Sequence, residues 1–287
     1  MKLNRYSHLS DEDINLSFMP RRTVADPDGW LAREAALSDK ARAAFKGARL
    51  DVPYGDTPLQ RLDIFPTARK DAPIHIYIHG GFWRALDKSN YSHVGATLAK
   101  AGALGVLINY DLCPKVTVDD VVRQTMAAIA WTWRHGGELG GDPSRIYISG
   151  HSAGGHLASM ALVHDWRAEG LPGDFIKGIG SLSGIYDLEP ILRIEANAEI
   201  QLKPEMVARN SPLFLEPLTM APVIVAPGGE EPDLWQQQSR DYAAMLTSRG
   251  YPVNLMVLPK HHHFSITMAL SDPGDPLMAA MLKQMGL

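Results

Sequence analysis

The chain has 287 residues, of which 45% are hydrophobic and 21% are charged, as in an ordinary globular protein. A formal net charge of −4 gives no indication of a nucleic-acid or anionic-membrane partner. The single cysteine, Cys113, excludes an intrachain disulfide and is typical of a reducing cytoplasm. We see no apolar leader and no apolar run of roughly 18 residues, so we expect neither a secretory signal nor a membrane span.

The predicted elements begin with a polar stretch, followed by a helix at residues 30–45 with Asp28 as its cap. Two strands at residues 49–54 and 60–65 are joined through Gly55 and Asp56, as in a hairpin. From residue 74 onward, strands and helices alternate. We expect strands at residues 74–79, 104–110, 145–149, 176–183, 222–226 and 253–258, and helices at residues 89–101, 118–135, 153–166 and 234–249.

This alternation predicts an α/β fold, with a mostly parallel eight-stranded sheet covered by helices on both faces. The antiparallel strands lie at its N-terminal edge. No linker is visible, so we expect residues 1–287 to form a single domain with residues 1–48 as a helical extension. Residues 184–218 contain prolines and interrupt the alternation, which makes them a candidate small cap.

The most informative motif is the sequence GHSAG at residues 150–154, between a predicted strand and a predicted helix. A G-x-S-x-G motif in that context is a nucleophile elbow, whose glycines permit the tight turn that exposes the serine, here Ser152. Such a serine reacts only with a base, an acid and an oxyanion hole. Each of these must be found elsewhere in the chain.

Backbone donors for an oxyanion hole are expected in the sequence HGGFW at residues 79–83, which follows a predicted strand. In an α/β hydrolase, one donor comes from this loop and one from the residue after the nucleophile. We therefore predict the Gly81 and Ala153 amides, with Gly80 as an alternative to Gly81.

The acid and the base are expected after the last two strands. The loop after residues 222–226 offers Glu230, Glu231 and Asp233, and residue chemistry alone does not choose among them. Three histidines at residues 261–263 follow the last strand, which completes the order serine, acid, histidine. Adjacent histidines in an extended loop point in different directions, and we see no complementary ligand cluster, so we expect no metal site.

Together these motifs resemble the α/β-hydrolase superfamily and, within it, the kynurenine formamidase (arylformamidase) and related esterase group. The resemblance covers about residues 49–270 and rests on HGGFW at 79–83, GHSAGGH at 150–156, SGIYD at 183–187, WQQQS at 235–239 and HFS at 263–265. It implies that Ser152 is the nucleophile, His263 the base and Glu231 the acid. Glu230 remains an alternative, because Trp235 stands where the group usually has Phe and many relatives carry Asp as the acid.

The resemblance implies a serine hydrolase that cleaves an aryl-formamide, N-formylkynurenine, to kynurenine and formate through an acyl-serine. Phe82 and Trp83 are candidates to line the aryl side of the pocket, with core packing as the alternative for both. Two other functions remain open: a carboxylesterase of short acyl esters, and a non-catalytic binding protein on a hydrolase scaffold. We expect a small-molecule substrate, no cofactor, a cytoplasmic location and, as the assembly to test, a homodimer.

Overall fold

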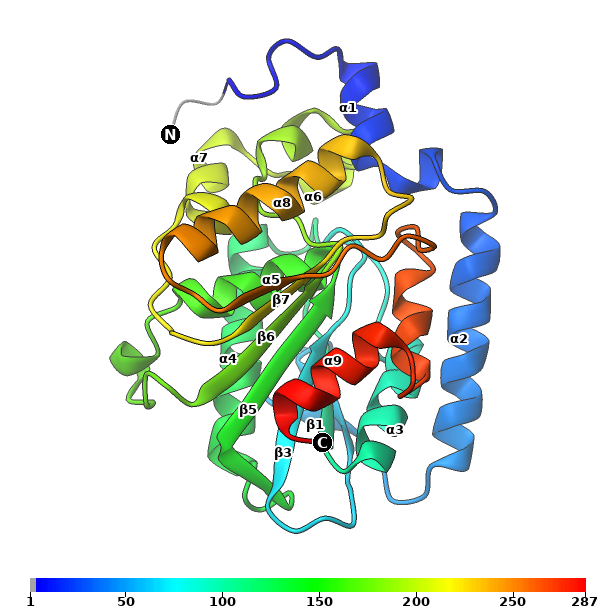
Figure 1. The fold of residues 1–287 in the computed structure, drawn as a ribbon, viewed down its shortest axis with the longest axis vertical. Coiled ribbons are helices and arrows are strands. Elements are labelled where there is room, and N and C mark those ends of the chain that lie inside the picture. Colours follow the sequence, from blue (N-terminus) through cyan, green and yellow to red (C-terminus); the bar gives the residue numbers. More distant parts are fainter. Residues whose placement is uncertain (1–3) are drawn as a thin grey trace.

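The computed structural model describes residues 4–287, and an eight-stranded sheet forms its centre (Figure 1). The strand order is β1-β2-β4-β3-β5-β6-β7-β8; the pairs β1–β2 and β2–β4 are antiparallel, and all other pairs are parallel. The strands are β1 Arg49–Pro53, β2 Arg61–Phe65, β3 Ala72–Ile78, β4 Leu104–Ile108, β5 Gly141–His151, β6 Ile176–Leu182, β7 Val223–Ala226 and β8 Val253–Leu255. The predicted α/β-hydrolase fold class is confirmed.

Helices cover both faces of the sheet because its central strands are apolar on both sides. All seven residues of β3 are buried. Two adjacent residues of this strand, Ile76 and Tyr77, point to opposite faces of the sheet and belong to two different core clusters. Among the helices that contribute to the cluster with Ile76 are α4 Val118–His135, α5 Ala153–Val163 and α8 Asp233–Ser248. The cluster with Tyr77 includes side chains of α3 Ser92–Ala101 and α9 Pro276–Met285.

The N-terminal extension differs from its prediction. An unpredicted helix, α1 Asp11–Phe18, starts with a capping box between Ser10 and Asp13. The next helix, α2 Pro27–Ala44, begins three residues before the predicted start, since Pro27 suits the first helical position and Asp26 caps Gly29 N–H. Asp28 instead pairs with Arg21. Helix α2 lies alongside α3 at the edge of the molecule (Figure 1).

The segment 184–218 folds into short helical turns, and other turns of this kind connect the larger elements. In the segment these are η4 Glu189–Arg193, α6 Asn197–Ile200, α7 Pro204–Val207, η5 Ala208–Asn210 and η6 Pro212–Phe214. The others are η1 Pro20–Arg22, η2 Lys88–Tyr91, η3 Trp166–Glu169 and η7 Ile266–Ser271. No helix among the described residues is both long and apolar enough to span a bilayer.

Candidate active site

Ser152 lies at a sharp turn between the end of β5 and the start of α5. Its backbone has φ 58° and ψ −120°, a conformation that L-residues adopt only when their surroundings enforce it. Ser152 N–H donates to Leu182 O at 2.9 Å, and His156 N–H donates to Ser152 O at 3.0 Å. These bonds fix the turn to the neighbouring strand and to the first turn of the helix.

The two glycines of the motif are required by close backbone approaches. A Cβ on Gly150 would overlap the carbonyl of Gly154, and a Cβ on Gly154 would overlap the carbonyl of Ile78. The elbow is therefore packed directly against the end of β3. This is the physical reason for glycine at both positions.

The loop after β3 passes beside the elbow. A Cβ on Gly80 would lie 3.1 Å from Ser152 Cβ, and Gly81 has φ +105°, a region that favours glycine. No hydrogen bond from the Gly81 or Ala153 N–H is formed within residues 4–287. Both amides are thus free to donate to a ligand beside Ser152.

The same loop is fixed from behind by His79 and Tyr110. The Tyr110 hydroxyl donates to His79 O at 2.8 Å, and the two rings stack with centroids 4.3 Å apart. His79 Nε2 also contacts Asn109 Oδ1 at 2.8 Å. A loop held in this way is preorganised, which is the condition for strong stabilisation of a developing oxyanion.

Glu231, and not Glu230, is the carboxylate that contacts His263. Glu231 Oε1 lies 2.6 Å from His263 Nδ1, while Oε2 accepts the Gly228 N–H at 2.8 Å. The Glu230 side chain is exposed, and its backbone N–H donates to His261 O at 3.0 Å. The acid loop and the histidine loop are thereby joined, so Glu231 is held against the imidazole.

Burial shapes the ionisation of this pair. It lowers the pKa of the His263 imidazole, helped by nearby His262, and it raises the pKa of the Glu231 carboxyl. The Gly228 N–H opposes the shift at Glu231 because it favours the anion. The contact assigns the Nδ1 proton to the bond with Glu231, which leaves Nε2 as a free acceptor.

The three consecutive histidines have three different environments. His261 Nδ1 contacts Ser265 O, His262 Nδ1 accepts the Phe264 and Ser265 N–H groups, and only His263 contacts Glu231. Within residues 4–287, no group of three or more His, Cys, Asp or Glu side chains has an arrangement that could hold a metal ion.

Ser152 and His263 line one cavity of about 110 Å³, and no hydrogen bond joins their side chains in residues 4–287. Such bonds often tighten only when substrate binds. Phe82 also lines this cavity. Trp83 does not: its side chain is fully buried, and its indole N–H donates to His156 Nδ1 at 3.2 Å. The structure therefore places Trp83 in the core.

Comparisons with known proteins agree with the hydrolase-like geometry of this site. A family model described as BD-FAE matches residues 62–177, which include the elbow. The kynurenine formamidases of Danio rerio and Salmo salar are 31% and 32% identical to this chain, over 99% of both chains in each case. The chain belongs to the kynurenine formamidase family.

The fold of this family member is similar to that of a solved α/β-hydrolase structure. A candidate thioesterase from Silicibacter sp. is 27% identical, with a TM-score of 0.77, and the match covers 89% of this chain and 94% of that one. As a member of this group, the protein is an α/β-fold hydrolase. The hypothesis of a non-catalytic binding protein has no support from these relatives.

Two further residues of this kynurenine formamidase family member face the cavity and were not predicted to do so. His151 lines the cavity with its ring centroid 4.6 Å from that of His263. Glu34 on α2 also lines it, although its side chain is buried. The sequence does contain a signal for Glu34: it shares a helix face with Leu31 and Ser38, where an acidic residue is unusual.

Proposed function

We propose that this protein hydrolyses N-formylkynurenine to kynurenine and formate, with Ser152 as nucleophile, His263 as base and Glu231 as acid. The observation that carries the proposal is the 2.6 Å contact between Glu231 and His263 beside the cavity that Ser152 lines. The full-length similarity to kynurenine formamidases supports the choice of substrate.

Acylation begins when Ser152 Oγ attacks the formyl carbon and His263 Nε2 takes the hydroxyl proton. The electron pair of the carbonyl π bond moves to oxygen, and the resulting oxyanion accepts the Gly81 and Ala153 N–H groups. Each donor in such a site contributes about 3 kcal/mol to lowering the barrier. Glu231 holds the imidazole in the correct tautomer and stabilises the imidazolium.

Collapse of this intermediate breaks the bond between the formyl carbon and the aryl nitrogen. The imidazolium of His263 donates its proton to that nitrogen, so the product leaves as a neutral arylamine and Ser152 keeps the formyl group. Water then attacks the formyl ester while His263 takes its proton, and formate leaves as Ser152 Oγ is reprotonated. Phe82, on the wall of the cavity, is placed to contact the aryl ring.

Hydrolysis of an ester, such as a short-chain carboxylester, is the second candidate function, favoured by the similarity to a candidate thioesterase. The same Ser152, Glu231 and His263 would perform it, since an alkoxide is an easier leaving group than an arylamine. The decisive measurement is kcat/KM for N-formylkynurenine and for p-nitrophenyl acetate. We expect efficient formamide cleavage that Ser152→Ala abolishes. Strong ester hydrolysis without formamide cleavage would reject the first function.

The choice of acid is tested by a matched pair of substitutions. We expect Glu231→Gln to reduce kcat by about 10³- to 10⁴-fold, because the amide no longer stabilises the correct imidazole tautomer or the imidazolium. Glu230→Gln should change kcat less than about 3-fold, since that side chain is exposed. Equal losses in the two variants would show that the assignment of the acid is wrong.

We also propose a cytoplasmic location, which is supported by the free, buried Cys113. A homodimer is the assembly to test, by light scattering from the purified protein.

A further inference from the structure

The cavity beside Ser152 is lined by a buried carboxylate whose hydrogen-bonding capacity is only partly used. Glu34 is 4% exposed, and its Oε1 has no hydrogen-bond partner within the described residues. Its side chain comes from α2 and lines the cavity together with Tyr91 and Thr267. A buried, unpartnered carboxylate is costly, so a position of this kind calls for a cationic or donor ligand.

A complementary cation lines the same cavity. Arg84 follows the Gly81 loop, and its Nη1 pairs with Glu199 Oε1 at 2.8 Å. Its Nε, however, is buried and has no hydrogen-bond partner within residues 4–287. The cavity is therefore lined by the carboxylate side chain of Glu34 and by the guanidinium side chain of Arg84, each of which has an unpartnered polar atom, and the apolar side chains of Leu31 and Phe82 also line it.

We infer that Glu34 and Arg84 bind the ammonium and the carboxylate of a zwitterionic amino acid, which makes this site selective for α-amino acids that carry an N-formylated arylamine. The inference rests on the proposed function and deepens it, because it names the groups that recognise the substrate away from the scissile bond. A zwitterion supplies a partner of opposite charge to each of these two side chains, and each contact is a charge-assisted hydrogen bond.

The ionisation of Glu34 agrees with a cationic ligand. Burial raises the pKa of Glu34 to about 7, and the hydroxyls of Thr267 and Tyr91 oppose that shift. An ammonium beside it would favour the anion. Burial keeps five nearby titratable groups uncharged near neutral pH: Tyr77, Tyr91, His93, His151 and His263. The cationic side chains that line the cavity with Glu34 are those of Arg21 and Arg84.

Binding to the inactive Ser152→Ala protein tests the inference without turnover. Calorimetry with L-kynurenine should give a Kd about 10- to 100-fold weaker when Glu34→Gln is added. The analogue of L-kynurenine that lacks the amino group should bind both proteins alike. Asp39→Asn is the matched control, because Asp39 is an exposed carboxylate on the same helix; it should leave both Kd values unchanged.

Arg84→Met tests the other end of the ligand. It should weaken L-kynurenine and the analogue without the amino group to the same extent, and leave the decarboxylated analogue, kynuramine, unaffected. Circular dichroism confirms that each variant is folded. If Glu34→Gln does not fold, the two ligands still test the inference in the Ser152→Ala protein alone. There, L-kynurenine must bind at least about 10-fold tighter than its analogue without the amino group.

The outcomes separate this inference from the proposed function. If Glu34→Gln leaves the Kd for L-kynurenine unchanged, or weakens both ligands equally, the zwitterion site is wrong even when N-formylkynurenine is cleaved. If the wild-type protein cleaves only esters while L-kynurenine binding still depends on Glu34, the formamidase proposal is wrong and the zwitterion site stands.

Discussion

Ser152 illustrates how single atoms fix the geometry of the candidate site. Its left-handed φ of 58° persists because β5 and α5 continue the chain on either side of the elbow and the end of β3 packs against it. The glycine at position 154 is central to this packing, since its α-carbon faces the Ile78 carbonyl. The position of the nucleophile therefore depends on a residue with no chemistry of its own.

Gly154→Ala should destabilise the protein by about 3 kcal/mol or more and strongly reduce activity, because the added methyl group must displace the β3 backbone. Gly137→Ala is the control: a Cβ there has no atom within 4 Å and the residue has no positive φ. That variant should match the wild-type protein within about 0.5 kcal/mol in urea denaturation. Similar losses in the two variants would contradict this explanation of the elbow.

At the scale of single residues, the sequence predicts some of the site and leaves the rest open. Ser152 can be placed from a motif, and chain order limits the base to the three histidines at residues 261–263. His263 and Glu231 are chosen only through the family resemblance, because adjacent loop residues point in different directions. In the structure, the contacts of Glu231 with Gly228 N–H and His263 Nδ1 show which acid turns inward. Glu34 could not be placed at all, since its environment depends on how α2 packs against the sheet domain.

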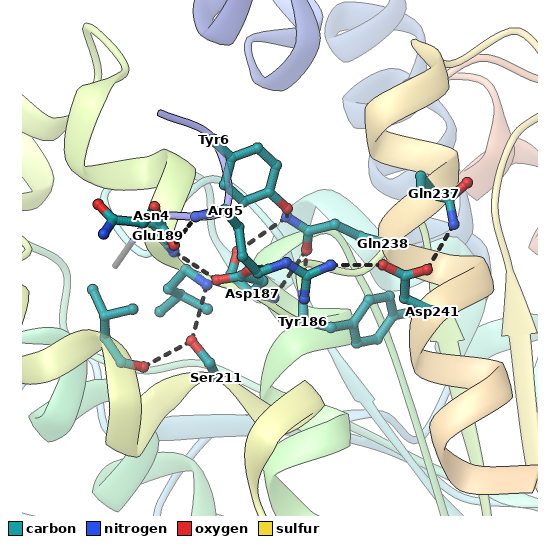
Figure 2. A network of polar contacts seen from close by, with 12 residues as sticks. Asn4, Arg5, Tyr6, Tyr186, Asp187, Glu189, Ser211, Gln237, Gln238 and Asp241 are labelled. Atoms are coloured by element: carbon teal, nitrogen blue, oxygen red, sulfur yellow. Dashed lines mark hydrogen bonds and ion pairs between the residues drawn. The ribbon is translucent and has the colours of Figure 1, made fainter. Parts of the chain in front are cut away.

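Among the elements, the N-terminal segment, the segment 184–218 and α8 are joined by one polar network (Figure 2). Gln238 on α8 lies at its centre. Its Oε1 accepts the Tyr186 and Asp187 N–H groups at 2.8 and 3.0 Å, and its Nε2 donates to Asp187 O at 3.0 Å. Arg5 extends the network from the N-terminal segment through an ion pair with Asp241 at 2.9 Å.

Gln238→Ala should therefore cost about 2–4 kcal/mol, because two buried backbone N–H groups lose their acceptor. The adjacent Gln237 is exposed, and its side chain bonds only to two other side chains of α8: it donates to Asp241 and accepts from Arg240. Gln237→Ala should change the free energy of unfolding by less than about 0.5 kcal/mol. Urea denaturation of the two variants makes the comparison, and an equal effect would show that this network does not stabilise the fold.

The predicted elements agree best with the structure where local signals mark both ends. Helix α4 spans residues 118–135 as predicted, between the Thr117 cap and Gly136. Helix α1 was missed because its segment is polar, and its few buried side chains contact distant parts of the chain. Strand β8 ends at Leu255 and not at residue 258, since it pairs on one side only and continues as the isolated bridge from Leu258 to Gly228.

In the molecule as a whole, buried histidines outnumber buried acids whose pKa values are raised. Burial lowers the pKa of one group, formed by His75, His79, His93, His151, His156 and His263. Burial raises the pKa of the other, formed by Glu34, Asp187 and Glu231. The two groups have opposite effects on stability as the pH falls.

Below pH 6.5 the unfolded chain takes up protons at histidines that stay neutral in the fold, so stability is lost. The raised acids instead bind protons in the fold before they do so in the unfolded chain, which adds stability. Because the histidines are more numerous than the acids, the free energy of unfolding should fall as the pH is lowered from 6.5 to about 4.5. Each titrating side chain contributes up to ~1.4 kcal/mol per pH unit.

Urea denaturation across this pH range measures the slope. His75→Gln should reduce it, because burial lowers the pKa of His75 to about 3, whereas a substitution at the exposed His8 should not. Stability that rises as the pH falls over this range would contradict the expectation.

The walls of the cavity come from three separate stretches of the chain. Residues 62–177, which match a family model, contain Ser152 and the Gly81 loop. Leu31 and Glu34 precede that region, and His263 and Thr267 follow it. Part of the surface that contacts substrate is thus encoded apart from the nucleophile. An exchange of the first 48 residues between related hydrolases would change the wall around Glu34 and leave the sequence of the elbow untouched. Divergence of substrate range within such a lineage can therefore begin in this leading segment.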